Sequence, residues 1–185
     1  MEHGKGTYVF GFEASYGCLV SDFVRDKDSI QAILMLCETA SYYEQKGMDL
    51  VEALNAIYEE YGYYHEGITN ITLKGLDGAD KIQRIMSFFR STDIALPSFK
   101  ILAKDDVKLG FKTCYECDKT TKINLPSSNV IKYYLNDNMC FVLRPSGTEP
   151  KLKVYYGVNG KSQAESNEKL EQLRKEVLAI VELIK

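Results

Sequence analysis

The 185-residue sequence has no long apolar run, no excess of basic residues and only two histidines. A membrane-spanning helix needs about 20 consecutive apolar residues, so we expect no transmembrane helix and no membrane partner. The N-terminal stretch MEHGKGTYVF also lacks the apolar core of a secretory signal peptide. The net charge is -3, whereas a general nucleic-acid-binding protein would carry a basic face, so we expect no nucleic-acid partner.

Five cysteines are scattered along the chain, an odd number without the regular spacing of a disulfide framework. We therefore expect reduced thiols and a cytoplasmic location. Cys114 and Cys117 have the CxxC spacing, but a zinc site needs two further ligands and a redox pair usually opens a helix. The flanking sequence, GFKTCYECDKTTKINL, predicts an extended hairpin instead. A structural role is favoured over a zinc or redox role.

The overall composition, with 45% hydrophobic and 26% charged residues, is typical of a globular protein with one large domain or two small ones. Its first third predicts a short hairpin around a turn at 11–17, followed by two helices. The first helix begins with Asp26 or Asp28 as its cap and ends at Gly47, and the second spans about 49–61. Apolar residues recur at helical spacing in the first helix, so we expect it to be well buried. They are Ile30, Ile33, Leu34 and Cys37. Because residues 1–60 hold few elements to cover these helices, we expect this unit to be incomplete.

The remaining residues predict an antiparallel sheet with helices on one face. A strand at 69–75 precedes a helix at 75–91, and a long amphipathic helix at 162–185 ends the chain. Five further strands are expected at 99–103, 110–116, 129–135, 139–143 and 153–158. The polar stretch 118–128 predicts a loop. The inward stripes of the two helices are Ile82, Ile85, Met86 and Phe89, and Leu170, Leu173, Val177, Val181 and Ile184. The predicted fold class is α+β, a helix-covered antiparallel sheet preceded by a mostly helical unit.

The turn LRPSGTEPK, residues 143–151, joins two of these strands and has the chemistry of an anion site. Pro145 fixes φ and Gly147 tolerates φ above zero, so successive N–H groups are able to converge on an anion. Arg144 offers a two-pronged fork to a phosphate. Further donors are Ser146, Thr148, and Lys151 or Lys153. The alternative is an ordinary polar hairpin loop whose arginine pairs with a surface carboxylate.

Two other turns give weaker signals. In GFEASYG, Glu13 and Ser15 project to one side of an extended segment, which suits the hydroxyl groups of a sugar. A turn with a capping serine is the alternative. Asp77 and Asp80 are too few to hold Mg²⁺ unaided and lie where a helix begins, so we predict a helix cap and no metal site.

Both glycine-containing turns, and their order, resemble the C-terminal part of the α-D-phosphohexomutases, the family of phosphoglucomutase and phosphomannomutase. The matching stretches are GFEASYGCLVSDFVRDKDS, EEYGYYHEGITNITLKGLDGADKIQRIM and FVLRPSGTEPKLKVYY, so the resemblance covers nearly the whole chain. It implies that residues 1–61 are the last part of the family's third domain, an α/β domain. It also implies that residues 62–185 are the complete fourth domain, with a hinge at 61–64.

The resemblance assigns roles to residues of both domains. In the third domain, Glu13 and Ser15 would recognise sugar hydroxyls and Lys27 would line the cleft. The fourth-domain loop would bind the phosphate of the substrate. Its residues are Arg144, Ser146, Gly147, Thr148 and Lys151. No catalytic residue and no metal ligand is expected in this chain.

The activity implied by the resemblance is an isomerase that moves a phosphoryl group between the 1- and 6-positions of a hexose phosphate. It would use Mg²⁺ and proceed through glucose 1,6-bisphosphate, which is both intermediate and activator. The phosphoserine loop and the three-aspartate magnesium loop of the first two domains do not occur in the sequence. We therefore expect an inactive fragment whose partners are the hexose phosphate and the missing N-terminal domains. The alternative is a stand-alone phosphosugar-binding or protein-interaction module without catalysis.

Overall fold

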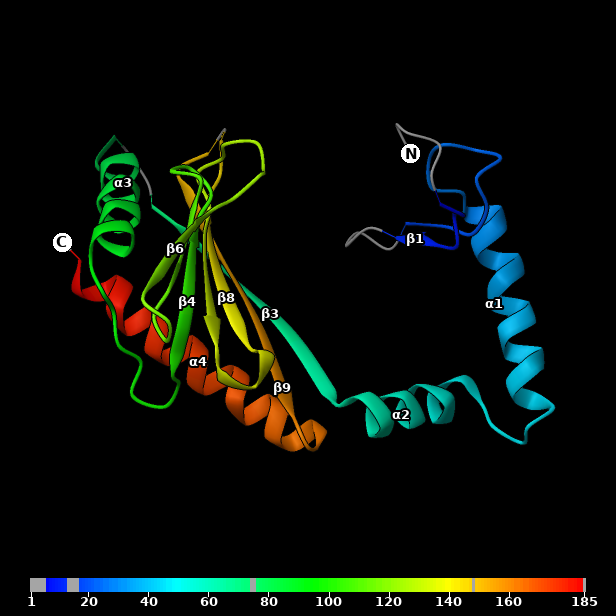
Figure 1. Ribbon diagram of the computed structural model, residues 1–185. Coiled ribbons are helices and arrows are strands. Elements are labelled where there is room, and N and C mark those ends of the chain that lie inside the picture. Colours follow the sequence, from blue (N-terminus) through cyan, green and yellow to red (C-terminus); the bar gives the residue numbers. More distant parts are fainter. Residues whose placement is uncertain (1–5, 13–16, 74–75, 148, 185) are drawn as a thin grey trace. The chain divides into compact units, whose positions relative to one another are not determined.

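The structure of the protein is a computed structural model that describes residues 6–12, 17–73, 76–147 and 149–184 (Figure 1). By its internal contacts the chain divides into two units, Met1–Ile57 and Tyr58–Lys185, which are described separately below. Among the described residues, no helix combines the length and the hydrophobicity that crossing a bilayer requires.

The first unit begins with a small hairpin in which β1 (Gly11–Phe12) pairs antiparallel with β2 (Cys18–Leu19). The hairpin predicted around the turn at 11–17 is therefore confirmed on both sides of residues 13–16, which lie outside the described residues. Next comes α1 (Ser29–Glu44), whose N-terminus is capped by the Asp28 carboxylate. This carboxylate accepts a hydrogen bond at 2.9 Å from a backbone N–H that the first helical turn leaves unpaired.

The second helix, α2 (Leu50–Tyr61), starts with a reciprocal pair of hydrogen bonds. The Asp49 carboxylate accepts from the backbone N–H of Glu52 at 2.8 Å, and the Glu52 carboxylate accepts from the backbone N–H of Asp49 at 2.9 Å. This capping box satisfies two otherwise unpaired donors and fixes the start of the helix.

The expected burial of α1 is wrong for this chain. The described part of the helix has no buried residue, and the Ile30 side chain is 76% exposed. Most of its other large apolar side chains are exposed as well, including Ile33, Leu34 and Leu36. The physical reason is that a hairpin with two-residue strands is too small to cover a 16-residue helix. The first unit is thus incomplete in the sense that its apolar face has no cover among the described residues.

The second unit is built on a seven-stranded sheet in which every pairing is antiparallel. The strand order is β3-β9-β8-β7-β4-β5-β6. The strands are β3 (Tyr63–Thr72), β4 (Ile101–Asp106), β5 (Phe111–Cys114), β6 (Lys119–Lys122), β7 (Ile131–Leu135), β8 (Cys140–Pro145) and β9 (Lys151–Gly160). A short 3₁₀ turn, η1 (Asn136–Asn138), connects β7 to β8.

Two helices, α3 (Leu76–Ser91) and α4 (Gln163–Leu183), cover one face of this sheet (Figure 1). Their apolar stripes and alternate residues of the central strands form a single core. Eight of the nine predicted inward residues are buried in it: Ile82, Ile85, Met86, Phe89, Leu170, Leu173, Val177 and Val181. The ninth, Ile184, is half-buried and packs against this core from the end of α4. The predicted α+β fold, an antiparallel sheet with helices on one face, is confirmed.

A buried ion pair ties the C-terminal end of α3 to β4. The Arg90 Nε atom donates to Asp106 Oδ2 at 2.6 Å, and Arg90 Nη2 donates to Asn129 Oδ1 at 2.9 Å. The other Asp106 oxygen accepts from the backbone N–H groups of Lys108 and Leu109 at 3.1 and 3.2 Å. One carboxylate therefore organises a helix end, a strand and the turn that follows the strand.

The prediction of a loop over 118–128 is wrong for its first part, where the structure has β6. All four residues of β6 are exposed, because this strand lies at the edge of the sheet and packs on neither face. Its sequence, Lys-Thr-Thr-Lys, thus shows no apolar alternation from which a strand could be recognised. The opposite edge strand, β3, is also longer than predicted, because its pairing with β9 continues back to Tyr63.

Candidate phosphate-binding site

The turn predicted to bind phosphate joins β8 to β9 at one end of the sheet. The register places Arg144 opposite Lys153 and Pro145 opposite Leu152. The backbone N–H of Ser146 donates to the carbonyl of Lys151 at 2.8 Å, which closes the turn. Across the neighbouring edge, the backbone N–H of Leu73 donates to the carbonyl of Pro150 at 3.0 Å. The predicted hairpin is confirmed, and its turn is held from two sides.

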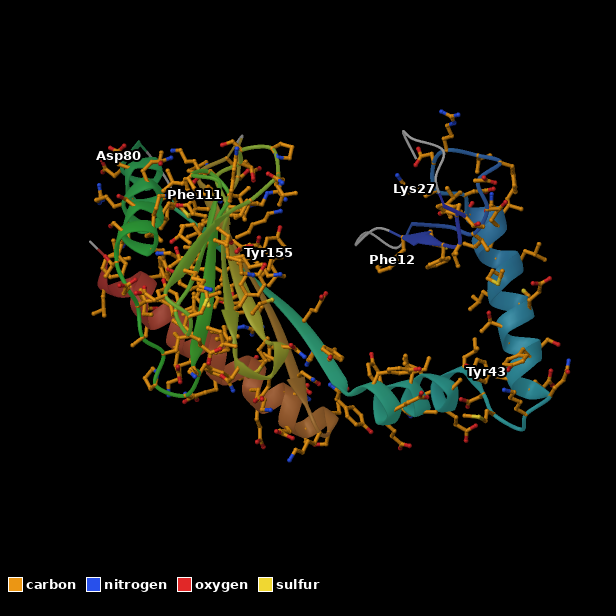
Figure 2. The ribbon with its side chains drawn as sticks, in the orientation of Figure 1. Phe12, Lys27, Tyr43, Asp80, Phe111 and Tyr155 are labelled. Atoms are coloured by element: carbon orange, nitrogen blue, oxygen red, sulfur yellow. The ribbon has the colours of Figure 1, made fainter. Side chains whose placement is uncertain are left out.

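Strand alternation gathers three cations on the face of the sheet that α3 and α4 leave open. Leu152 and Val154 point into the core, so Lys151 and Lys153 point the other way, together with Arg144 opposite Lys153. Directly opposed residues have Cβ atoms about 5 Å apart, and residues two apart on one strand are separated by about 7 Å. Figure 2 labels Tyr155, which follows Lys153 on this open face. Like charges this close repel each other, and an anion between them would relieve the repulsion.

The side chains of Arg144 and Lys153 make no hydrogen bond or ion pair with any residue that the structure describes, although the charge of Lys153 acts on nearby Glu149. Lys151 is already engaged, because its Nζ atom lies 2.9 Å from Glu149 Oε2. The hydrogen bond from Lys151 and its charge, with a smaller contribution from the charge of Lys153, hold the pKa of Glu149 below its ordinary value. The two cations without such partners are therefore the strongest candidates for an external anion. From the sequence, Lys153 was only an alternative to Lys151 as a phosphate ligand. The strand register is the observation that places Lys153 opposite Arg144.

The turn residues differ in part from the expectation. Gly147 does not have a positive φ, so the proposed convergence of N–H groups through a left-handed glycine is not found. A Cβ atom at Gly147 would meet nothing within 4 Å, so the glycine leaves open space beside the turn. Ser146 is half-buried within the turn, while Thr148 lies outside the described residues.

The residues predicted to contact the sugar belong to the first unit. Glu13 and Ser15 lie outside the described residues. Lys27 lines a small pocket of about 210 Å³ together with Phe12 and Cys18 of the β1–β2 hairpin (Figure 2). The backbone N–H of Lys27 donates to Asp26 Oδ1 at 2.8 Å, and this bond, with the Lys27 charge, lowers the pKa of the Asp26 carboxyl. Lys27 is thus placed beside the hairpin whose turn carries Glu13 and Ser15 in the sequence.

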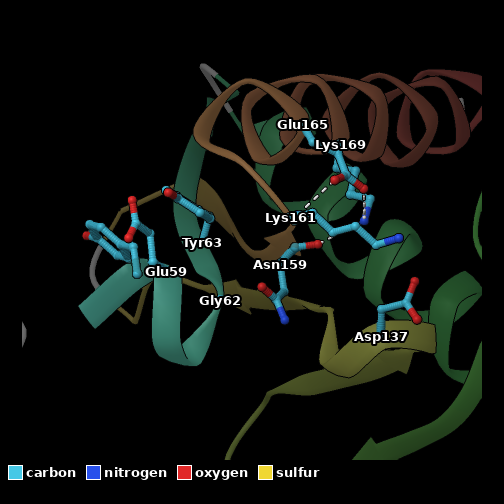
Figure 3. Close-up of a pocket in the computed structure, with 10 residues that line it drawn as sticks. Glu59, Gly62, Tyr63, Asp137, Asn159, Lys161, Glu165 and Lys169 are labelled. Carbon is cyan, nitrogen blue, oxygen red and sulfur yellow. Dashed lines mark hydrogen bonds and ion pairs between the residues drawn. The ribbon is translucent and has the colours of Figure 1, made fainter. Parts of the chain in front are cut away.

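A larger polar pocket, of about 660 Å³, lies at the other end of β9 (Figure 3). Its lining includes an ion pair in which Lys169 Nζ lies 2.8 Å from Glu165 Oε1. Because β9 has ten residues, this pocket lies roughly 30 Å from Lys151 along the strand. Three carboxylates and two lysines line it, a balance that disfavours an anion. The pocket is therefore separate from the cation cluster of Arg144, Lys151 and Lys153.

The described residues contain no group of three or more histidine, cysteine, aspartate or glutamate side chains that could hold a metal ion together. Asp77 lies in the first turn of α3, where a carboxylate interacts favourably with the helix dipole. The candidate site that the structure offers is thus a turn beside three cationic side chains on an α+β domain.

Comparison with known proteins identifies the family. The family model described as "Phosphoglucomutase/phosphomannomutase, C-terminal domain" matches residues 69–180. The model described as "Phosphoglucomutase/phosphomannomutase, alpha/beta/alpha domain III" matches residues 1–61. The chain belongs to the phosphoglucomutase/phosphomannomutase family, and it contains sequence from two of the family's domains.

Similar proteins include phosphoglucomutases of two staphylococci. The chain is 39% identical over 153 residues to the phosphoglucomutase of Staphylococcus epidermidis, which covers 82% of this chain and 28% of that protein. It is also 39% identical over 148 residues to a Staphylococcus aureus phosphoglucomutase, covering 80% of this chain and 27% of the relative. The chain therefore spans little more than a quarter of the length of these relatives.

A solved structure has the same fold. It is the open form of the exocytosis-sensitive phosphoprotein pp63/parafusin, a phosphoglucomutase from Paramecium. The TM-score is 0.61 at 17% identity, over 91% of this chain and 29% of that chain.

Proposed function

We propose that this chain grips the phosphate and the sugar hydroxyls of a hexose phosphate as part of a phosphohexomutase. In the proposed reaction a phosphoryl group moves between the 1- and 6-positions, and glucose 1,6-bisphosphate is the intermediate and activator. The observation that carries the proposal is the pairing of Arg144 with Lys153 on the open face of the sheet, next to the turn that contains Ser146. Membership of the phosphoglucomutase/phosphomannomutase family supplies the reaction class.

In this proposal the described residues bind and orient the substrate. The Arg144 guanidinium would donate two hydrogen bonds to the phosphate that is not reacting, and Lys153 would add a point charge from the opposite strand. Ser146, Gly147 and Thr148 would border the phosphate, and Lys151 would contribute once its pairing with Glu149 is shared. Phosphoryl transfer depends mainly on positioning and charge stabilisation, so a firm hold on the distant phosphate serves to orient the reacting end.

The sugar and cofactor parts of the proposal rest on other segments. Glu13 and Ser15 would recognise the sugar hydroxyls, with Lys27 beside them. Residues 1–61 would be the end of the third domain and residues 62–185 the fourth domain. The phosphoserine and Mg²⁺ would come from domains that this sequence does not contain, and we expect the chain alone to be inactive.

A second candidate function is a phosphosugar-binding or protein-interaction module without catalysis. The exposed apolar residues of α1 favour a surface that binds protein. Light scattering distinguishes the two candidate functions. A protein-interaction module should self-associate in a way that α1 substitutions reduce and hexose phosphate does not change, whereas a domain that binds the substrate predicts no such self-association.

The direct test is an NMR titration of the chain with glucose 1,6-bisphosphate. We expect shifts centred on Arg144, Ser146 and Lys153. Substitution Arg144→Ala removes hydrogen bonds to a charged group, worth about 2 kcal/mol, and should weaken binding roughly 30-fold. Substitution Lys122→Ala is the matched control, because it removes an exposed cation from the distant edge strand β6.

Two results would contradict the phosphate-gripping role. One is an unchanged affinity in Arg144→Ala, since the proposal makes this side chain the main phosphate contact. The other is an equal loss in Lys122→Ala, which would mean that only the net charge of the chain matters.

A further inference from the structure

The β5–β6 hairpin places two cysteines, Cys114 and Cys117, at one tight turn. This hairpin forms the edge of the sheet opposite to the edge strand β3. Cys114 ends β5 and lies opposite Lys119, the first residue of β6. The backbone N–H of Cys117 donates to the Cys114 sulfur at 3.3 Å. Asp118, directly after the second cysteine, has φ of 49° in the left-handed region, which lets the chain reverse within four residues. The two thiols are therefore brought to the same side of the turn.

The residues between the two cysteines are fixed by contacts with the neighbouring segment. The backbone N–H of Tyr115 donates to the carbonyl of Leu102 at 2.9 Å. The Glu116 carboxylate pairs with Lys100 Nζ at 2.6 Å. The two cysteine side chains make no hydrogen bond to the neighbouring segment among the described residues, with Cys114 half-buried and Cys117 exposed. The turn presents them as a preorganised and accessible pair.

The surroundings of Cys114 favour a thiolate. The hydrogen bond from the Cys117 thiol lowers the pKa of Cys114, and the backbone N–H of Cys117 lowers it further. Burial acts in the opposite direction but is outweighed. The negative charge of Glu116 also raises the pKa of Cys114, but the hydrogen bonds outweigh it. The same hydrogen bond between the two thiols raises the pKa of Cys117, so the turn favours ionisation of Cys114 first.

We propose that Cys114 and Cys117 form a two-thiolate site for Cu(I). Thiolates are soft ligands that select soft ions such as Cu(I), whereas a structural Zn²⁺ takes four ligands in a tetrahedron. The described residues hold no group of three or more potential ligands, so this site supplies two sulfurs and no more. Binding replaces the two thiol protons by one Cu(I), which releases two protons and leaves one negative charge beside Lys119.

This copper site is separate from the proposed phosphate site. Cys114 lies three strand spacings from β8 and about four residues along the strands from Arg144. With strands about 4.8 Å apart and about 3.4 Å per residue, the distance is roughly 20 Å. The inference therefore does not rest on the proposed function, and loss of one site should leave the other intact.

The test is an anaerobic competition titration of the reduced chain against bicinchoninate, a chelator that is coloured when it holds Cu(I). We expect one Cu(I) per chain. Cys114→Ser and Cys117→Ser should each weaken binding by on the order of 100-fold or more, because removing a ligand costs at least as much as removing a group behind a ligand. Cys37→Ser is the matched control, since it removes an exposed cysteine that has no CxxC partner, and it should leave Cu(I) binding unchanged.

A second measurement uses the unsubstituted chain, so it does not depend on how the variants fold. Cu(I) should protect Cys114 and Cys117, but not Cys37, from alkylation by iodoacetamide, as mapped by peptide mass spectrometry. The proposal is overturned if the serine variants bind Cu(I) as tightly as the parent chain, or if alkylation of the pair is unaffected. It is equally overturned if the pair binds one metal ion per two chains, because that result defines a four-thiolate site shared between copies.

Discussion

Substitution of Asp106 by alanine tests how strongly the buried ion pair of the second unit stabilises the fold. The Asp106 side chain is only 7% exposed and that of Arg90 18% exposed. Removing the carboxylate deprives Arg90 Nε of its 2.6 Å partner and leaves Asn129 as its one remaining hydrogen-bond acceptor among the described residues. It also removes the acceptor from the backbone N–H groups of Lys108 and Leu109.

The expected loss follows from this burial. Breaking a buried ion pair by removing one partner costs about 3 to 5 kcal/mol, because the other charge stays buried without compensation. Asp106→Asn keeps an acceptor for the two backbone N–H groups and should cost less, about 1 to 3 kcal/mol. The matched control is Glu116→Ala, which breaks the Lys100–Glu116 pair. That pair has the same 2.6 Å separation, but its side chains are 67% and 52% exposed. An exposed pair of this kind contributes about 0 to 1 kcal/mol.

The assay is urea unfolding, in which the exchange of the backbone amide hydrogens of β4 and β7 is measured at each urea concentration. Both strands belong to the second unit, so their exchange reports on that unit alone. We expect the order of destabilisation to be Asp106→Ala, then Asp106→Asn, then Glu116→Ala. Equal losses of unfolding free energy in Asp106→Ala and Glu116→Ala would refute the reasoning. The stability that an ion pair contributes would then depend on the separation of its two charged atoms and not on the burial of its side chains. A loss below about 1 kcal/mol in Asp106→Ala would refute it as well.

Three further predictions concern pH, helix capping and the anion site. Burial opposes ionisation of Glu176, but hydrogen bonds from Ser98 and Gln172 outweigh it and hold its pKa below the ordinary 4.5. The resulting stability is present above pH 4.5 and is lost as the pH falls through the folded-state pKa, so Glu176→Gln should flatten this acid limb in thermal scans at pH 3 to 7. Ser162 caps α4 by accepting a backbone N–H at 3.2 Å, and Ser162→Ala should cost about 1 kcal/mol in urea unfolding, whereas Ser162→Asp should cost little. Lys153→Ala should weaken binding of glucose 1,6-bisphosphate and reduce the salt dependence of its affinity in calorimetry, and an unchanged salt dependence would remove Lys153 from the site.

Local features of the sequence determined much of the fold. A helix cap at Asp26 or Asp28 was predictable, because a short polar side chain before an apolar periodic stretch satisfies the first free N–H groups. The structure shows that Asp28 is the cap. The stripes that include Phe89 and Leu173 were predictable from their 3.6-residue period, and both residues are fully buried. The hairpin around Arg144 followed from strand-like residues on both sides of a Pro-Ser-Gly turn. These signals lie within a few residues of the feature they specify, so one sequence is enough to show them.

The tertiary structure decided what depends on residues far apart in the chain. Strand register, which is set by pairing along the whole β8–β9 hairpin, puts Lys153 opposite Arg144 and leaves Lys151 paired with Glu149. Pairing with β5, and not an apolar alternation in the sequence, makes a strand of Lys119–Lys122. Helical periodicity showed that α1 has an apolar face, but only the set of surrounding elements determines whether that face is covered. A sequence pattern reports which side of an element is apolar; the partner that packs against it is a property of the assembled fold.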